Sequence, residues 1–169
     1  METNQFCLTI EGHNPAPQGS KKYAGHRYNA RAGRSLPLLL EESNRVAPWR
    51  HTVTSLARRA MADQRLSAPL DGPLYARLIF CMEPTQGAAK KLKKNPRTTF
   101  PDTRSYGDLD KIQRSTFDGL ADAGVIKDDA RVVHVEAMKV LPGFFHMLSQ
   151  PGCYVHIATV DPAAMRLRA

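Results

Sequence analysis

The chain has 169 residues, of which 42% are hydrophobic and 24% charged, which is enough for one domain with a packed core. It carries 24 Lys and Arg against 16 Asp and Glu, a formal charge of +8 that favours a polyanionic partner, most commonly nucleic acid. A solvated basic surface is the other explanation of this charge. Three widely spaced cysteines without a Cys-x-x-Cys pair argue against a disulfide framework or a zinc ribbon.

Nothing in the sequence directs the chain to a membrane. The first residues, Met1-Glu2-Thr3-Asn4-Gln5, have neither the charged nor the apolar region of a signal peptide. No apolar run approaches the length of about 20 residues that a membrane helix needs. Cysteines of this kind are typical of a reducing compartment. We therefore expect a cytoplasmic protein without a membrane partner.

The N-terminal part combines a strand pattern with a long basic segment. Apolar and more polar residues alternate over residues 6–11, which predicts a half-buried strand that ends at Gly12. Residues 13–35 have no periodicity but hold several prolines, glycines and cations. We interpret them as a basic loop that is either functional or disordered, because structureless loops of this length are usually one or the other. A short extended piece is expected at residues 36–40.

One helix and one central strand are predicted next. Apolar residues recur at helical spacing from Pro48, which suits a first turn, to about Leu66. Within this helix Trp49 is expected to anchor the core. Both sets of alternating residues from Leu74 to Met82 are largely apolar, which is typical of a central strand covered on both faces.

A second basic loop, residues 87–104, leads into an acidic stretch. Gly87 and Pro96 argue against a continuous helix through it. A run of like charges is often only a solvated loop tip, but the position of this run directly before Asp108 favours a role in holding phosphates. The cations that we expect to bind the DNA backbone from the two loops are Lys21, Lys22, Lys90, Lys91, Lys93, Lys94, Arg97 and Arg104.

The acidic stretch is the strongest candidate for a functional site. Asp108 and Asp110 are two residues apart, which places both carboxylates on one face of an extended backbone. A helix is predicted to follow, with Asp110 as its N-cap and Gly124 as its stop. The chain is then expected to return with Asp128-Asp129, and either of these can supply a third carboxylate. Three converging carboxylates need a cation, and oxygen ligands favour Mg²⁺ or Mn²⁺ over zinc.

The cations near this stretch have two explanations. Arg114 falls one helical turn after Asp110 and either forms a surface ion pair worth at most about 1 kcal/mol or directs a fixed cation at a bound phosphate. The aspartates themselves are either metal ligands for phosphodiester hydrolysis or only caps and turn residues. In the second case the protein is a non-catalytic DNA-binding protein.

The C-terminal part predicts two strands. Residues 132–140 are rich in valine and residues 154–160 are largely apolar, so we expect a hairpin with a long connection. The tail, residues 161–169, is expected to be mobile. The whole chain, residues 1–169, is predicted to be a single α+β domain. Its expected architecture is a two-layer sandwich, in which two main helices pack on one face of a mixed sheet.

A resemblance to the RusA family of Holliday-junction resolvases is carried by Asp108-Leu109-Asp110-Lys111-Ile112-Gln113-Arg114-Ser115-Thr116-Phe117-Asp118-Gly119-Leu120, then Asp128-Asp129-Ala130-Arg131-Val132-Val133 and Lys139. The resemblance implies a homodimeric, Mg²⁺-dependent endodeoxyribonuclease that nicks four-way DNA junctions in recombination or repair. Mn²⁺ is expected to substitute for Mg²⁺, and no small-molecule cofactor is implied. Because such proteins are often carried by phages, the resemblance places the protein in a bacterial or phage-infected cytoplasm.

The resemblance also assigns residues. Asp108, Asp110 and Asp129 match the catalytic, metal-binding aspartates of the family. Arg114 stands where the family usually has a catalytic lysine, and Lys111 stands where it usually has asparagine. Because arginine does not readily release a proton, an electrostatic role for Arg114 survives this change and a general-acid role does not. Lys111 and Lys139 complete the expected DNA-binding cations. The rival activity is a metal-dependent nuclease acting on flaps or other branched DNA.

Overall fold

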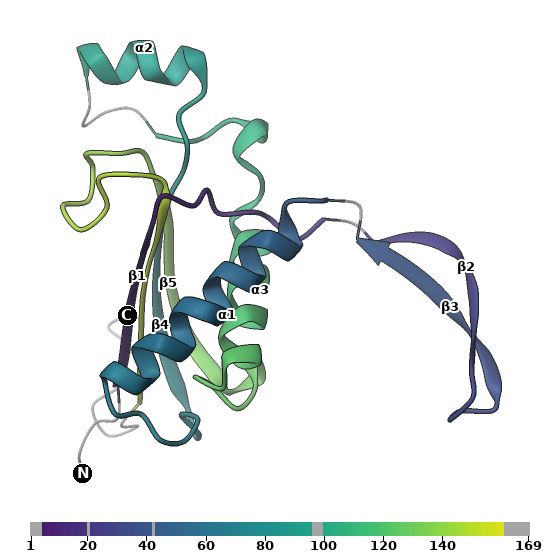
Figure 1. Cartoon of the computed structure of the whole chain (residues 1–169). Helices are drawn as coiled ribbons and strands as arrows, with labels where there is room; N and C mark the ends of the chain where they lie inside the picture. The colour runs from purple at the N-terminus through teal and green to yellow at the C-terminus, as the bar shows by residue number, and fades with distance from the viewer. Residues whose placement is uncertain (1–4, 20, 42, 96–99, 161–169) are drawn as a thin grey trace, which may run out of the picture.

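The structure describes residues 5–19, 21–41, 43–95 and 100–160. In the computed structural model, a four-stranded mixed sheet has two long helices on one face, and a two-stranded hairpin extends away from them (Figure 1). In chain order the elements are β1 (Gln5–Glu11), β2 (Lys21–Asn29), β3 (Arg34–Glu41), α1 (Val46–Asp63), β4 (Leu74–Cys81), α2 (Gln86–Lys94), η1 (Arg104–Tyr106), α3 (Leu109–Ala123), η2 (Asp129–Arg131), β5 (Val132–Val140) and β6 (Gly152–Thr159).

The strands of the main sheet are ordered β1-β6-β4-β5, and only the β4–β5 pair is parallel. This confirms the prediction of an α+β fold with a mixed sheet. The predicted hairpin between the last two strands is wrong, because β4 lies between β5 and β6. The reason is the crossover through α3, which returns the chain parallel to β4 and so places β5 on the outer side of β4.

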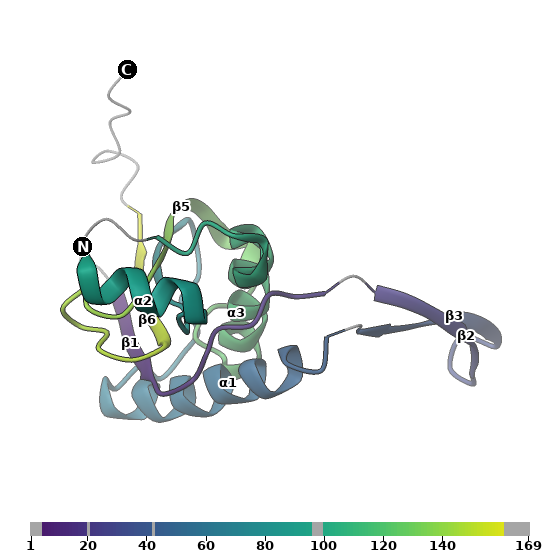
Figure 2. The same ribbon diagram turned by 90° about the horizontal axis from the view of Figure 1, so that it is seen from above.

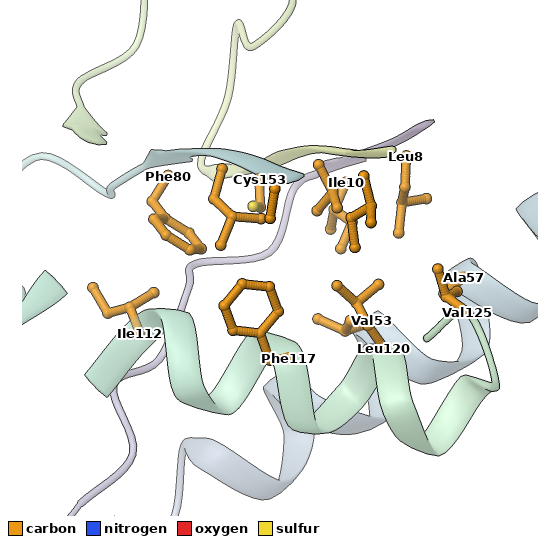
Figure 3. Close-up of a cluster of buried hydrophobic side chains, with 14 of the residues drawn as sticks. Leu8, Ile10, Val53, Ala57, Phe80, Ile112, Phe117, Leu120, Val125 and Cys153 are labelled. Atoms are coloured by element: carbon orange, nitrogen blue, oxygen red, sulfur yellow. The ribbon is translucent and has the colours of Figure 1, made fainter. Parts of the chain in front are cut away.

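The core lies between the sheet and helices α1 and α3 (Figure 3). The helices approach closely at Gly119, where a Cβ atom would lie 2.9 Å from the Cβ of Val53. Trp49 is only 3% exposed, and its indole Nε1 donates a hydrogen bond of 3.1 Å to Thr116 Oγ1. The predicted role of Trp49 as a core anchor is therefore confirmed. A buried, hydrogen-bonded contact of this kind fixes how the start of α1 sits on α3.

The first predicted basic loop is largely a β-hairpin. Strands β2 and β3 pair antiparallel, from Lys21 opposite Glu41 to Asn29 opposite Arg34, so a structureless loop over residues 13–35 is wrong. The extended piece expected at residues 36–40 lies within β3. The hydrophobic pattern of the sequence does not reveal the hairpin. The pairing register of its two strands is set by the turn and not by an alternation of apolar and polar residues. Asn29 Oδ1 accepts a hydrogen bond from Ala32 N at 3.1 Å and closes that turn.

The second predicted basic loop also contains regular structure. Helix α2 carries Lys90, Lys91, Lys93 and Lys94, and the Thr85 hydroxyl caps it by accepting a hydrogen bond from Ala88 N. Three of these lysines lie in the last turn, where the helix dipole favours cations. Helix α2 therefore includes Gly87 and ends at Lys94, and the prediction of a continuous loop over residues 87–104 is wrong. Arg97 and the tail 161–169 fall outside the described residues.

None of the helices that the structure describes combines the length and the apolar character needed to cross a membrane.

Candidate active site

The N-terminus of α3 presents Asp108 and Asp110. Asp108 occupies the N-cap position in an extended conformation, with φ −80° and ψ 137°, and its side chain makes no capping hydrogen bond. The prediction that Asp110 is the N-cap is therefore wrong, since Asp110 lies in the first helical turn. Carboxylates at this end of a helix are favoured by its dipole. Both side chains are exposed, so neither is committed to the core.

Lys111 holds Asp108 in its charged form. Its Nζ lies 2.9 Å from Asp108 Oδ2. The hydrogen bond from Lys111 and then its charge lower the pKa of Asp108, with smaller contributions from the charges of Lys139 and Arg104. The same hydrogen bond raises the pKa of Lys111, and the charge of Asp110 adds to that rise. Asp108 is thus an anion at neutral pH and already has one cation beside it.

Lys139 links the end of β5 to the acidic stretch. This half-buried lysine pairs in register with Phe80 and donates a hydrogen bond of 2.8 Å from Nζ to the Gly107 carbonyl. Gly107 has φ +76°, and a Cβ atom there would lie 2.5 Å from Pro17 Cγ, so glycine is required. Lys139 was expected to contact DNA. In the structure it fixes the backbone directly before Asp108.

A segment that sequence reasoning did not assign to the site packs against the start of α3. Ala16 O accepts a hydrogen bond of 2.6 Å from the buried Ser115 hydroxyl, and Gln18 N donates one of 3.0 Å to Lys111 O. The Gln18 Oε1 atom is buried and has no hydrogen-bond partner among the described residues. The signal available in the sequence was Ser115, a polar residue on the buried side of a helix.

Asp129 lies at the other end of α3. The helix has fifteen residues and spans about 22 Å, with Asp110 in its first turn and Asp129 beyond its C-terminal end. Strand β5 then runs back along this length, and only its far end, at Lys139, meets Gly107. Within a single copy the structure therefore does not bring Asp129 together with Asp108 and Asp110.

A metal site within one copy does not fit this geometry. Among the described residues, no three His, Cys, Asp or Glu side chains gather into a group that could hold a metal ion. Asp108 and Asp110 alone offer two hard carboxylate donors at one helix end. The predicted set of three aspartates needs its third member from elsewhere. The length of the predicted helix was the sequence signal that could have revealed the separation of Asp129 from Asp110. The two ends of a helix of fifteen residues lie about 22 Å apart.

The structure distinguishes Asp128 from Asp129. Asp128 Oδ1 accepts a hydrogen bond of 2.8 Å from Ala130 N and caps the short helix η2. The Asp129 side chain is exposed and makes no hydrogen bond or ion pair with the residues that the structure describes. Asp128 is occupied as a turn residue, and Asp129 is the carboxylate that is available to a ligand.

The remaining predicted cations lie on several different elements. Arg114 is exposed on α3 and forms no ion pair with Asp110 among the described residues. Arg104 begins η1, close enough for its charge to act on Asp108. The lysines of α2 are all exposed. Lys21 and Lys22 begin β2, but their side chains lie outside what the structure describes.

Comparison with known proteins points to one family. The model of the family described as endodeoxyribonuclease RusA matches residues 14–157, which is most of the 169-residue chain. The matched range contains Asp108, Asp110, Asp129 and the hairpin β2–β3. A search of curated proteins found no match.

Proposed function

Because the chain belongs to the RusA family of endodeoxyribonucleases, we propose that it is a Mg²⁺-dependent enzyme that resolves Holliday junctions by paired nicks. The observation that carries this proposal is the pair of exposed carboxylates, Asp108 and Asp110, at the start of α3 in a protein of net charge +8. An anionic phosphodiester approaches such a pair favourably only when a metal neutralises it. The basic surface supplies the general attraction for DNA.

We further propose that the metal site is shared between two copies of the chain. One copy would provide Asp108 and Asp110, and the second copy would provide its Asp129 from the opposite end of its own α3. This arrangement supplies the three oxygen donors that one copy does not bring together. Bound Mg²⁺, or Mn²⁺ in its place, would lower the pKa of a water molecule and neutralise charge on the phosphate.

Strand β5 supports such a pairing. In the described part of the chain it has only β4 as a neighbour, so its other edge is open. Val133, Val135 and Met138 are 58%, 37% and 40% exposed, and an exposed apolar edge strand is a template for pairing with another chain. Two β5 strands related by a two-fold axis run antiparallel. The start of one, which follows Asp129, then lies beside the end of the other, where Lys139 contacts Gly107.

The chain's own residues have separate roles in this proposal. Lys111 keeps Asp108 ionised, and Lys139 holds the backbone that positions it. Arg114 stays protonated and contributes only electrostatic stabilisation. The α2 lysines, Arg104 and the hairpin cations are proposed to hold phosphates outside the metal's coordination shell, because ammonium and guanidinium groups donate to phosphate and cannot bind a cation.

The proposal is tested with Asp110→Asn. This variant is expected to lose Mg²⁺-dependent cleavage of a four-way junction and to lose calorimetric Mn²⁺ binding, while junction affinity stays within about twofold because the backbone contacts remain. The matched control is Asp118→Asn on the same helix, since Asp118 pairs with Arg50 at 3.2 Å and has no place in the proposed site. Cleavage retained by Asp110→Asn contradicts the assignment. Unchanged Mn²⁺ binding favours a non-catalytic DNA-binding protein.

Substrate choice is tested separately. Cleavage of a four-way junction, a flap and a linear duplex is compared at one salt concentration, because phosphate contacts make every DNA affinity depend on salt. We expect paired nicks in the junction and little cleavage of the other two. Faster cleavage of the flap identifies the rival nuclease activity on branched DNA.

A further inference from the structure

We infer that the β2–β3 hairpin is an arm that binds duplex DNA beside the cut site and sets a minimum duplex length for the substrate. The inference rests on the proposed function in one respect, namely that the substrate is DNA with duplex arms. Four observations carry it: the position of the hairpin, its anchored root, its charge and the hollow near its tip.

The hairpin extends from the body of the protein in two perpendicular views (Figures 1 and 2). Its strands have nine and eight residues and pair with each other as a separate two-stranded sheet. An isolated two-stranded hairpin is only marginally stable in water. A partner that covers the hairpin would therefore stabilise it.

The root of the hairpin is fixed to the proposed catalytic end of α3. Residues 16–18, just before β2, are held there by two hydrogen bonds, from Ser115 Oγ to Ala16 O and from Gln18 N to Lys111 O. Pro17 is in close contact with Gly107, which precedes Asp108. The described segment that precedes the arm therefore lies beside the acidic pair.

The charge of the hairpin identifies the partner as a polyanion. Residues 21–41 contain one acid, Glu41, which lies opposite Lys21 at the root of the hairpin. Their cations are Lys21, Lys22, Arg27, Arg31 and Arg34. DNA fits this charge, because it releases counterions when such cations bind its phosphates.

A hollow near the tip provides matching contacts. It has a volume of about 500 Å³, and its lining includes the polar Arg27, Tyr28 and Arg31 and the apolar Leu36 and Leu38. Tyr28 is 68% exposed. The arginines form no ion pair with any residue that the structure describes. Two guanidinium groups beside a phenol hydroxyl and an apolar wall suit the phosphates and sugars of a DNA backbone.

The length of the arm limits how far along a DNA duplex it can make contacts. Nine residues of strand extend about 30 Å. At about 3.4 Å per base pair this corresponds to roughly nine base pairs from the acidic pair. The major groove of B-DNA also admits a two-stranded β-ribbon, so a hairpin of this shape can follow the duplex without unwinding it.

The test uses four-way junctions with arms of about 6 or about 20 base pairs, bound by the full-length protein in EDTA so that cleavage plays no part. The wild-type protein is expected to bind the long-armed junction at least about tenfold more tightly. The variant Arg27→Gln/Arg31→Gln/Arg34→Gln is expected to bind both junctions equally. Its plot of log affinity against log salt should be less steep by about 2.7 for each arm that contacts DNA, the value for three lost phosphate contacts.

The control is Arg59→Gln/Arg65→Gln, which removes exposed cations near the C-terminal end of α1, remote from the hairpin. It should keep the dependence on arm length. The inference is overturned if the hairpin variant keeps the dependence on arm length. It is also overturned if the wild-type protein sediments as a dimer and the hairpin variant as a monomer, because the arm would then be a contact between copies. Mn²⁺ binding by the hairpin variant is expected to be unchanged. A wrong assignment of the arm would therefore appear in the DNA affinities, and a wrong assignment of the metal site would appear in Mn²⁺ binding.

Discussion

At the scale of single residues, the ion pair between Asp108 and Lys111 stabilises a charged carboxylate at the start of a helix. The hydrogen bond from Lys111 lowers the pKa of Asp108 below its ordinary 3.8, so the stabilisation it provides is present above that pH and is lost as the pH falls through the lowered value. The pKa of Lys111 is raised above 10.5, so its contribution is lost only above that value. The pair is therefore intact throughout the neutral range.

A bound metal ion must compete with this lysine. In Lys111→Asn, we expect the pKa of Asp108 to return toward its ordinary value and Mn²⁺ affinity to rise roughly twofold to fivefold, because the competing cation is 2.9 Å from the ligand in the wild type. The carbon resonance of the Asp108 carboxyl group reports the first effect, and calorimetry reports the second. Lys127→Asn is the control, since Lys127 forms a similar pair with Asp71 at 3.1 Å, away from α3's start. Weaker Mn²⁺ binding in Lys111→Asn would show that the lysine supports the metal site.

At the scale of elements, the open edge of β5 makes the clearest prediction. Val133→Lys/Val135→Lys places two charges on this edge, and lysines on an edge strand oppose its pairing with another chain. Sedimentation is expected to show a monomer, and Mn²⁺ binding is expected to be lost, while circular dichroism stays that of the wild type because both side chains are exposed. Met147→Lys, at an equally exposed apolar residue of the loop before β6, should remain a dimer. A monomeric wild type would contradict the pairing.

Elements whose signals are local could be predicted from the sequence. Helix α3 shows this best, because Ile112 and Leu120 are fully buried at helical spacing and Gly124 ends the helix with φ +86°. The β2–β3 hairpin could not be predicted, since its described side chains form no buried face that would impose alternation and its register shifts near Gly25. The position of β5 could not be predicted either, because pairing order depends on which strand edge is free when the chain returns.

The candidate site could likewise be predicted from the sequence only in part. Residue types and spacing identified Asp108, Asp110 and Asp129, but spacing along a chain gives no direction in space. Asp108 and Asp110 are together because they are two residues apart, whereas Asp129 is separated from them by the whole length of α3. The contacts that position the acidic pair, from Lys139 to Gly107 and from Gln18 to Lys111, join segments 32 and 93 residues apart and leave no local pattern.

At the scale of the whole molecule, the proposed dimer consists of two copies that complete each other's sites. Each copy offers an acidic pair at one end of α3, Asp129 at the other end, and an open β5 edge between them. A two-fold arrangement yields two equivalent sites, which suits a substrate cut in two symmetry-related strands. The two hairpin arms would then grip duplexes on opposite sides of the pair. In this proposal the net charge of +8 attracts the junction as a whole, and the arms would determine its orientation.

The most direct test of the shared site is complementation between two inactive variants. Asp110→Asn and Asp129→Asn are each expected to be inactive and to lose calorimetric Mn²⁺ binding. After the two are mixed and allowed to exchange subunits, half of the dimers contain one copy of each, and one of the two sites in such a dimer has every aspartate. We expect about a quarter of the wild-type Mn²⁺ sites to return, together with single nicks in four-way junctions. If all three aspartates act within one copy, every site in the mixture stays damaged, and the absence of recovered Mn²⁺ binding and nicking would contradict the shared site.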